Sequence, residues 1–416
     1  MTASRLYRLR PAFGLAAAMM SVWGLVYTFP LFVVPLATEL HADRAAIAGI
    51  VVAILFWGAL VGPGLGALID RFGPRPAVLG GIGLSVIGYA AFSQAHELWQ
   101  AYVAFAGILG TGQTLIYLGA NVLIARTFAG ERATAYGVAY AGLGIGTGLY
   151  AFGGQLLVDQ FGWRTAALLL SVTPLIVVPA VLRLHPGAAA RVTIARSPAS
   201  ASAAGGSSEA RRGHRAAGIG VFALICFSSL SLGLVDEGIY QNLLPHAIVV
   251  GFTPALAALA LTAVSLAYVL AQLVGGAAMD RFGAPRTALA AFAVGAVGMV
   301  GVVTARSGVP LASVWLLVAA LLYGAGLAVL LLVRLATFAE RFAGPRFGFL
   351  SGIFALAYPI GGSFVVWFGG LAYDLWRSYL PAFGVSAAGL LLAVGALLAV
   401  TWRRDNAGET ALRKAS

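Results

Sequence analysis

Charge is scarce in this sequence. Only 10% of its 416 residues are Asp, Glu, Lys or Arg, whereas soluble domains carry about 25%. The hydrophobic fraction is 60% and the mean hydropathy is +0.93. A soluble globule of this length could not bury so much apolar surface. The composition therefore indicates an all-α protein that crosses the lipid bilayer, because each helix satisfies its own backbone polar groups there.

Cysteine and histidine are also rare. The single cysteine, Cys226, lies in an apolar run, which excludes a disulfide framework and a thiolate metal site, and the five histidines have no ligand spacing. The glycine run at 142–148 follows no strand, so close helix packing is expected there and not a phosphate site. We predict no enzyme, no metal and no cofactor. Basic residues spread over loops also argue against nucleic acid as a partner.

The apolar runs predict twelve transmembrane helices in two six-helix bundles. Residues 1–185 form the expected N-terminal bundle, 186–216 a cytoplasmic linker rich in Ala, Ser and Gly, and 217–416 the C-terminal bundle with a short tail. Although three arginines precede the first run, it is too long for a signal peptide. The expected spans are 13–38, 45–69, 76–95, 98–126, 132–158, 163–184, 217–247, 255–279, 287–306, 310–338, 347–372 and 378–402.

Basic residues set the expected orientation. With the N-terminus inside, 21 Lys and Arg residues fall on inner loops and tails and 4 on outer loops. Under the positive-inside rule this bias places both termini and the linker in the cytoplasm. The expected location is the cell membrane.

One charged sequence occurs twice, between apolar runs. Gly66-Ala-Leu-Ile-Asp70-Arg71-Phe-Gly73-Pro-Arg75 is repeated 210 residues later as Gly276-Ala-Ala-Met-Asp280-Arg281-Phe-Gly283-Ala-Pro-Arg286. The repeat indicates two equivalent, pseudo-symmetric bundles. It resembles the loop between the second and third helices of each half of the major facilitator superfamily. That resemblance implies a secondary transporter that holds its substrate between the halves and works by alternating access.

Shorter motifs point to one branch of that superfamily. Phe161-Gly162-Trp163-Arg164 opens the sixth span, and Gly370-Leu-Ala-Tyr373-Asp374 with Ser378-Tyr379 surrounds the end of the eleventh. Both resemble the oxalate/formate and monocarboxylate porters. The implied substrate is a small organic anion, a carboxylate. Symport with protons is a separate hypothesis, because titratable acids inside the seventh span could carry the proton.

The repeated loops are the candidate gate. The resemblance implies that Asp70 meets the start of the eleventh span near Arg346, and that Asp280 meets the start of the fifth near Arg132. A carboxylate is stabilised at the positive N-terminus of a helix. The expected gating residues are Asp70, Arg71, Arg75, Arg132, Asp280, Arg281 and Arg346. The alternative is a loop that only sets topology.

Polar residues within apolar spans are the candidate binding site. Gln113, Tyr117 and Asn121 recur every four residues, which places them on one helix face. In the seventh span Asp236 and Tyr240 share a helix face in the same way, and so do Glu237 and Gln241. The predicted substrate-binding residues are Tyr27, Gln113, Tyr117, Asn121, Tyr240, Gln241, Tyr268, Arg334 and Tyr358.

Three ionisable residues lie inside apolar spans: Asp236, Glu237 and Arg334. Such groups are costly in a bilayer unless they pair or function. Asp236 and Glu237 are the candidate proton carriers. Arg334 is a candidate receptor for a carboxylate, with an ion pair to either acid and snorkelling to the interface as the alternatives.

Two rival functions remain open. A drug/proton antiporter of the same fold would have Gly-Pro before two glycines in the fifth span, where this chain has Leu149-Tyr150 before Gly153-Gly154. A membrane receptor without transport activity would need no polar stripes. Substrate-dependent uptake into vesicles separates these alternatives.

Overall fold

A computed structural model describes residues 3–42, 44–128, 131–182 and 208–415, and in this part of the chain every regular element is a helix. The all-α prediction is confirmed. The helices of the N-terminal half are α1 (Ala3–Tyr27), α2 (Phe29–Glu39), α3 (Arg44–Phe72), α4 (Pro74–Ser93), α5 (Leu98–Ala101), the π-helix η1 (Tyr102–Leu109), α6 (Gly110–Thr127), α7 (Arg132–Ser171), the 3-10 helix η2 (Thr173–Val177) and α8 (Val178–Leu182). Those of the C-terminal half are α10 (Ser208–Val249), α11 (Pro254–Phe282), α12 (Ala284–Thr304), α13 (Ala312–Phe342), α14 (Phe347–Trp376) and α15 (Leu380–Ala415).

Eleven segments of the described chain are long and apolar enough to cross a membrane. One of them, at 132–182, is 51 residues long, far beyond the roughly 20 that a crossing needs. It contains a break at Gly162, whose φ of 75° and ψ of 163° are not helical. Counting its two sides separately gives the twelve predicted spans. Glycine is suited to this position because positive φ costs it nothing.

The chain divides into two compact units. One contains Met1–Pro186 and Pro345–Leu356, and the other contains Gly187–Gly344 and Ala357–Ser416. Helix α14 therefore changes unit along its length, just before Pro359 interrupts its backbone hydrogen bonding. Helix α10 begins at Ser208, inside the expected linker, so the end of that segment is helical. The rest of the expected linker, 186–207, lies outside the described residues.

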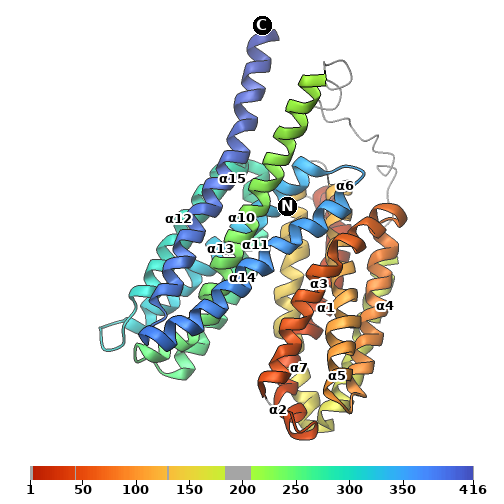
Figure 1. Ribbon diagram of the computed structural model, residues 1–416, viewed down its shortest axis with the longest axis vertical. Helices are drawn as coiled ribbons and strands as arrows, with labels where there is room; N and C mark the ends of the chain where they lie inside the picture. Colours follow the sequence, from red (N-terminus) through yellow and green to blue (C-terminus); the bar gives the residue numbers. More distant parts are fainter. Residues whose placement is uncertain (1–2, 43, 129–130, 183–207, 416) are drawn as a thin grey trace. The chain divides into compact units, whose positions relative to one another are not determined.

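The same helix pairs pack in both units (Figure 1). In the first unit α6 packs against α3 and α4; in the second, α13 packs against α11 and α12. Glycines make the closest approaches. A Cβ at Gly112 would lie 2.6 Å from the Gly81 carbonyl oxygen, and one at Gly326 would lie 2.3 Å from the Gly295 nitrogen. Both glycine pairs are separated by the same number of residues, so the contact itself is repeated.

The glycine run of the fifth span also serves close packing, as predicted. A Cβ at Gly142 would lie 2.1 Å from the carbonyl oxygen of Ala16, and one at Gly146 would lie 2.1 Å from that of Met20. Helix α1 can lie this close to α7 only because these positions lack side chains.

Large apolar side chains cover the outside of both units. Leu60 is 73% exposed, Phe152 72% and Ile176 79% in the first unit, and Val274 is 69% exposed in the second. In water such a surface would aggregate. In a bilayer it faces lipid, which agrees with the composition.

Candidate functional site

A polar cluster lies within the second unit, where α10, α13 and α14 meet, with Arg334 buried and Asp236 and Tyr358 half-buried. Tyr358 of α14 donates a hydrogen bond from its hydroxyl to the Asp236 carboxylate of α10. The two helices come this close because α10 has a glycine there: a Cβ at Gly233 would lie 2.2 Å from the Tyr358 carbonyl oxygen. An acid in the middle of an apolar helix is thus joined to a phenol from another helix.

Arg334 of α13 completes this cluster. Its side chain is buried, with 7% of the residue exposed, so it does not snorkel into solvent. Nη1 donates to Ser229 Oγ at 2.6 Å, and Cζ lies 5.4 Å from the centre of the Tyr358 ring, within the range of a cation–π contact. Tyr358 therefore touches both the acid, through its hydroxyl, and the base, through its ring.

Two hydrogen bonds fix α13 against α10. One is the Arg334–Ser229 bond, and the other runs from the Tyr323 hydroxyl to the Val235 carbonyl oxygen at 2.8 Å. The two bonds lie three turns apart on α13. Together these two bonds fix the position of Arg334 along α10.

Glu237 lies beside Asp236 and has its own partner. Gln241 Nε2 donates to Glu237 Oε2 at 3.0 Å, which agrees with the predicted i, i+4 pairing. Gly362 leaves room for this acid, since a Cβ there would lie 2.7 Å from Glu237 Cγ. Of the other predicted residues, Tyr240 lies 3.4 Å from Ser265 Oγ, and Tyr268 is half-buried on α11.

The polar stripe of the first unit has a different character. Asn121 is 1% exposed and accepts a hydrogen bond at Oδ1 from the Tyr140 hydroxyl at 2.9 Å. The Tyr136 hydroxyl donates to the Asn121 carbonyl oxygen at 3.2 Å. The Tyr117 ring lies 5.9 Å from that of Trp23 in a tilted contact and 6.1 Å from that of Tyr140 in an edge-on contact. These residues form a neutral aromatic and amide cluster that joins α1, α6 and α7.

Two other predicted residues of the first unit are more exposed than Asn121. Gln113 is half-buried on α6, and Tyr27, at the end of α1, is 48% exposed. Sequence reasoning missed Tyr136 and Tyr140 as partners. Their spacing of four residues in the fifth span was the available signal.

The Asp70 carboxylate binds the N-terminus of α14. Oδ1 accepts from the Gly348 backbone nitrogen at 2.9 Å and Oδ2 from that of Phe349 at 3.0 Å. Arg126 Nη2 lies 3.1 Å from Oδ1. The contact with the start of the eleventh span is the one that the resemblance implied, but its cation is Arg126, which was not among the predicted residues.

Close glycine contacts extend from that carboxylate along α3. A Cβ at Gly66 would lie 2.0 Å from the Gly348 carbonyl oxygen, and one at Gly352 would lie 2.5 Å from Gly62. The first turns of α14 thus belong to the first unit by direct backbone packing. A side chain at any of these positions would force the helices apart.

Of the other predicted gating residues, two lie beside neighbouring aromatic rings and Arg75 reaches a distant part of the first unit. The Arg71 guanidinium lies 5.3 Å from the Phe72 ring centre, and its repeat counterpart Arg281 lies 5.2 Å from that of Phe282. Arg75 donates to the Leu182 carbonyl oxygen. Arg132 starts α7 and Arg346 is exposed just before α14. The expected meeting of Asp280 with the start of α7 involves both units and stays a prediction.

No metal site accompanies the cluster in the described residues. They contain no group of three or more His, Cys, Asp and Glu side chains placed to hold a metal ion. Two open hollows of about 320 and 490 Å³ lie at the loops around Gly251 and Leu311, away from Arg334. The candidate site is therefore defined by the polar cluster around Arg334 and not by these hollows.

Comparison with known families gives a match over nearly the whole chain. The model of the Major Facilitator Superfamily matches residues 12–235 and 219–415. The two matched ranges correspond to the two halves that the repeated loop indicated.

Similar curated proteins are monocarboxylate transporters. Monocarboxylate transporter 13 of Rattus norvegicus is 26% identical over 388 residues, which cover 91% of this chain and 85% of that protein. Monocarboxylate transporter 11 of Homo sapiens is 31% identical over 289 residues, covering 63% and 56%. The resemblance to the monocarboxylate porter branch is confirmed at this level of identity.

Similar solved structures share the fold. The major facilitator transporter FucP, in an outward conformation, superposes with a TM-score of 0.66 at 16% identity, covering 93% of this chain and 98% of FucP. The proton:xylose symporter XylE gives a TM-score of 0.70 at 16% identity, with 95% of each chain covered. At such identities the likeness establishes the architecture alone.

Proposed function

Because the chain belongs to the major facilitator superfamily and is a multi-pass membrane transporter, we propose that it carries a small monocarboxylate together with a proton. The observation that carries this proposal is the position of Tyr358, which contacts Asp236 with its hydroxyl and Arg334 with its ring. Similarity to the monocarboxylate transporters supports the same substrate class.

Arg334 is the proposed receptor for the substrate carboxylate. A guanidinium is always charged and presents its donors in a planar fork that matches a carboxylate. At the centre of a membrane helix an arginine costs about 2.5–3.5 kcal/mol on insertion scales. Ser229 and the Tyr358 ring hold the guanidinium in a fixed orientation, and these two contacts offset part of that cost. An ammonium substrate would be repelled there.

Asp236 is the proposed proton carrier, with Glu237 beside it. In the empty, deprotonated site the negative charge of Asp236 balances the positive charge of Arg334. When a carboxylate binds Arg334, protonation of Asp236 keeps the site from gaining a net negative charge. Buried charge is expensive in a low dielectric, so anion and proton bind together more favourably than either alone. We call this replacement of the Asp236 charge by the charge of the substrate carboxylate charge exchange. It couples substrate and proton movement in the same direction, which is symport.

Asp70 is the proposed gate. Its carboxylate accepts two backbone hydrogen bonds at the first turn of α14, where the helix dipole favours a negative charge. α14 also supplies Tyr358 to the candidate site. A single helix is thus held at one end by the gate and carries a site residue further along.

The orientation is proposed with both termini and the linker in the cytoplasm, from the distribution of basic residues. In a Cys226→Ala background, a cysteine at Ser307 should react with an impermeant thiol reagent in intact cells, and one at Ala343 should not. The reverse pattern would overturn this orientation.

The test of the transport proposal is uptake by the purified protein in liposomes. With an acidic exterior, the vesicles should accumulate radiolabelled lactate above the equilibrium level. Asp236→Asn should abolish accumulation but retain lactate exchange, because its substrate receptor is intact. The matched control is Asp374→Asn, an exposed acid near the end of α14, which should accumulate lactate like the parent. Accumulation of an organic cation in place of lactate would favour the drug antiporter.

A further inference from the structure

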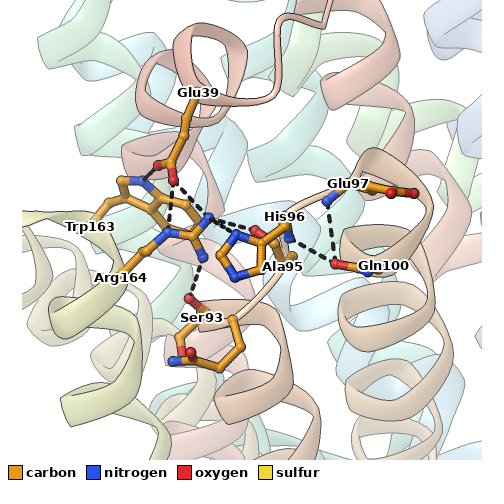
Figure 2. A network of polar contacts seen from close by, with 9 residues as sticks. Glu39, Ser93, Ala95, His96, Glu97, Gln100, Trp163 and Arg164 are labelled. Carbon is orange, nitrogen blue, oxygen red and sulfur yellow. Dashed lines mark hydrogen bonds and ion pairs between the residues drawn. The ribbon is translucent and has the colours of Figure 1, made fainter.

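The Gly162-Trp163-Arg164 motif forms a dense polar network within the first unit that the proposed transport site does not use (Figure 2). Arg164 Nε donates to Glu39 Oε1 at 2.8 Å, Nη1 to the Ser93 carbonyl oxygen at 2.8 Å and Nη2 to that of Ala95 at 2.7 Å. One guanidinium thus joins the end of α2, the turn after α4, and the part of α7 that follows Gly162.

Trp163 reinforces the same junction. Its Nε1 donates to Glu39 Oε2 at 2.6 Å, so each carboxylate oxygen has its own donor. The Arg164 guanidinium lies 4.5 Å from the Trp163 ring centre. The indole also lies near Phe32 and Phe92 in tilted contacts, at ring-centre distances of 6.3 and 5.9 Å. Glu39 is therefore held by two donors of fixed orientation.

The opposite end of α2 is weakly connected to α1. The helical pattern changes after Thr28: its nitrogen still donates to the Gly24 carbonyl oxygen at 3.2 Å and to that of Leu25 at 3.3 Å, but Leu31 donates to the Thr28 carbonyl oxygen at 2.9 Å in a tighter turn. The Thr28 hydroxyl donates to the Leu25 carbonyl oxygen at 2.6 Å and shares a hydrogen bond with the Tyr89 hydroxyl of α4, so this residue is a fixed point. Pro30 and Pro35 have no N–H to donate. The eleven-residue helix α2 thus has few backbone bonds to α1 and can turn about the fixed Thr28 with little loss of backbone hydrogen bonding.

From this geometry we propose that α2 is an outer segment of the first span that is hinged at Thr28. Its C-terminal end is pinned through Glu39 by Trp163 and Arg164. Hinge and pin occupy opposite ends of the same short helix. When the pin holds, Phe32 and Leu36 stay buried at 0% exposure. When it opens, α2 turns about Thr28 and this end of the unit loosens. The device stands independently of the substrate that the transporter carries.

Charge explains why the pin is stable at ordinary pH. Burial raises the pKa of the Glu39 carboxyl, but the hydrogen bonds from Arg164 and Trp163 outweigh it and hold that pKa below its ordinary value of 4.5, helped by the charges of Arg164 and His96. A lowered folded-state pKa gives stability that is present above the ordinary value and lost as the pH falls through the lowered one. Between pH 5 and 8 we expect no change in the pin from Glu39.

Cysteine accessibility in the purified full-length protein tests the hinge. In a Cys226→Ala background, Leu36→Cys reports on the buried face of α2, and Val22→Cys, also at 0% exposure, reports on α1 below the hinge. We expect Glu39→Gln to raise the maleimide reaction rate at position 36 by about tenfold, because this change removes roughly one charge-assisted hydrogen bond. The reaction rate at position 22 should not change.

The matched control is Glu97→Gln. Glu97 lies in the same network, but its carboxylate accepts from Trp99, so this change should not affect position 36. Arg164→Lys keeps a positive charge but cannot reach Glu39 and both carbonyl oxygens together, and should give an intermediate rate. An unchanged rate at position 36 in Glu39→Gln would overturn the proposal. An equal rise at position 22 would also overturn it, because the whole unit would then have loosened.

Discussion

The two units repeat their helix contacts but place their charges differently. In the first unit, the described ion pairs lie at helix ends, Glu39 with Arg164 and Asp70 with Arg126, while the middle of α6 carries the neutral Asn121. In the second unit, Asp236 and Arg334 lie inside apolar helices and share Tyr358. The repeated glycine contacts give both units the same helix packing, but the cluster of Asp236, Tyr358 and Arg334 lies in the second unit.

Of the changes that test this difference between the units, removing Arg334 should have the largest effect on transport. Arg334→Ala should lower lactate transport by about 100-fold or more, because two charge-assisted hydrogen bonds to the substrate would be lost. Arg334→Lys should retain part of the activity, since an ammonium keeps the charge but not the fork. Initial uptake rates in liposomes, corrected for the amount of folded protein, provide the measurement.

The matched change in the first unit is Asn121→Ala, which removes an uncharged partner and should cost no more than about tenfold. A larger loss from Asn121→Ala than from Arg334→Ala would reverse the comparison. If Arg334 instead serves an ion pair, Arg334→Ala should lower thermal stability and be rescued in part by Asp236→Asn.

Asp70→Asn should have an intermediate effect. An acid at a helix N-terminus is worth about 0.3–2 kcal/mol, which shifts a conformational equilibrium by several-fold. We expect slower transport with unchanged lactate affinity, because the gate and not the receptor is altered. The accessibility of a cysteine at Phe349 should rise in the same variant. Parent-like transport and accessibility would leave the loop with only a topological role.

Tyrosine hydroxyls give the smallest but most selective contrast. Tyr140→Phe removes the donor to Asn121 and should cost about 1 kcal/mol of stability without altering the pH dependence of uptake. Tyr358→Phe removes the donor to Asp236 but keeps the ring beside Arg334, and should shift that pH dependence. Uptake measured from pH 5 to 8 separates the two variants, and equal shifts in both would contradict the assigned roles.

Much of the scaffold could be predicted from the sequence. Long apolar runs, the repeated loop and the branch motifs identify spans, halves and family, because a bilayer imposes length and composition on each helix. The kink at Gly162 falls within the predicted gap between the fifth and sixth spans. The separation of α2 from α1 was missed, since the apolar run continues through Thr28 without a change in hydropathy.

The partners within the site could not be predicted. Arg334 was singled out by its cost in an apolar span, but Ser229 is 105 residues away and was one of several serines in α10. Asp236 was expected to share a helix face with Tyr240, but that spacing could not indicate its hydrogen-bond partner Tyr358, 122 residues away. Helical spacing reports neighbours on one helix. Contacts between helices depend on packing, which the glycine approaches decide.

Proton uptake on substrate binding tests the central claim most directly. Calorimetry of lactate binding to the purified protein, in buffers of different ionisation enthalpy, counts the protons taken up per lactate bound. Charge exchange at Arg334 and Asp236 predicts about one proton for the parent and almost none for Asp236→Asn. The same proton uptake in both proteins would contradict the assignment of Asp236 as the carrier.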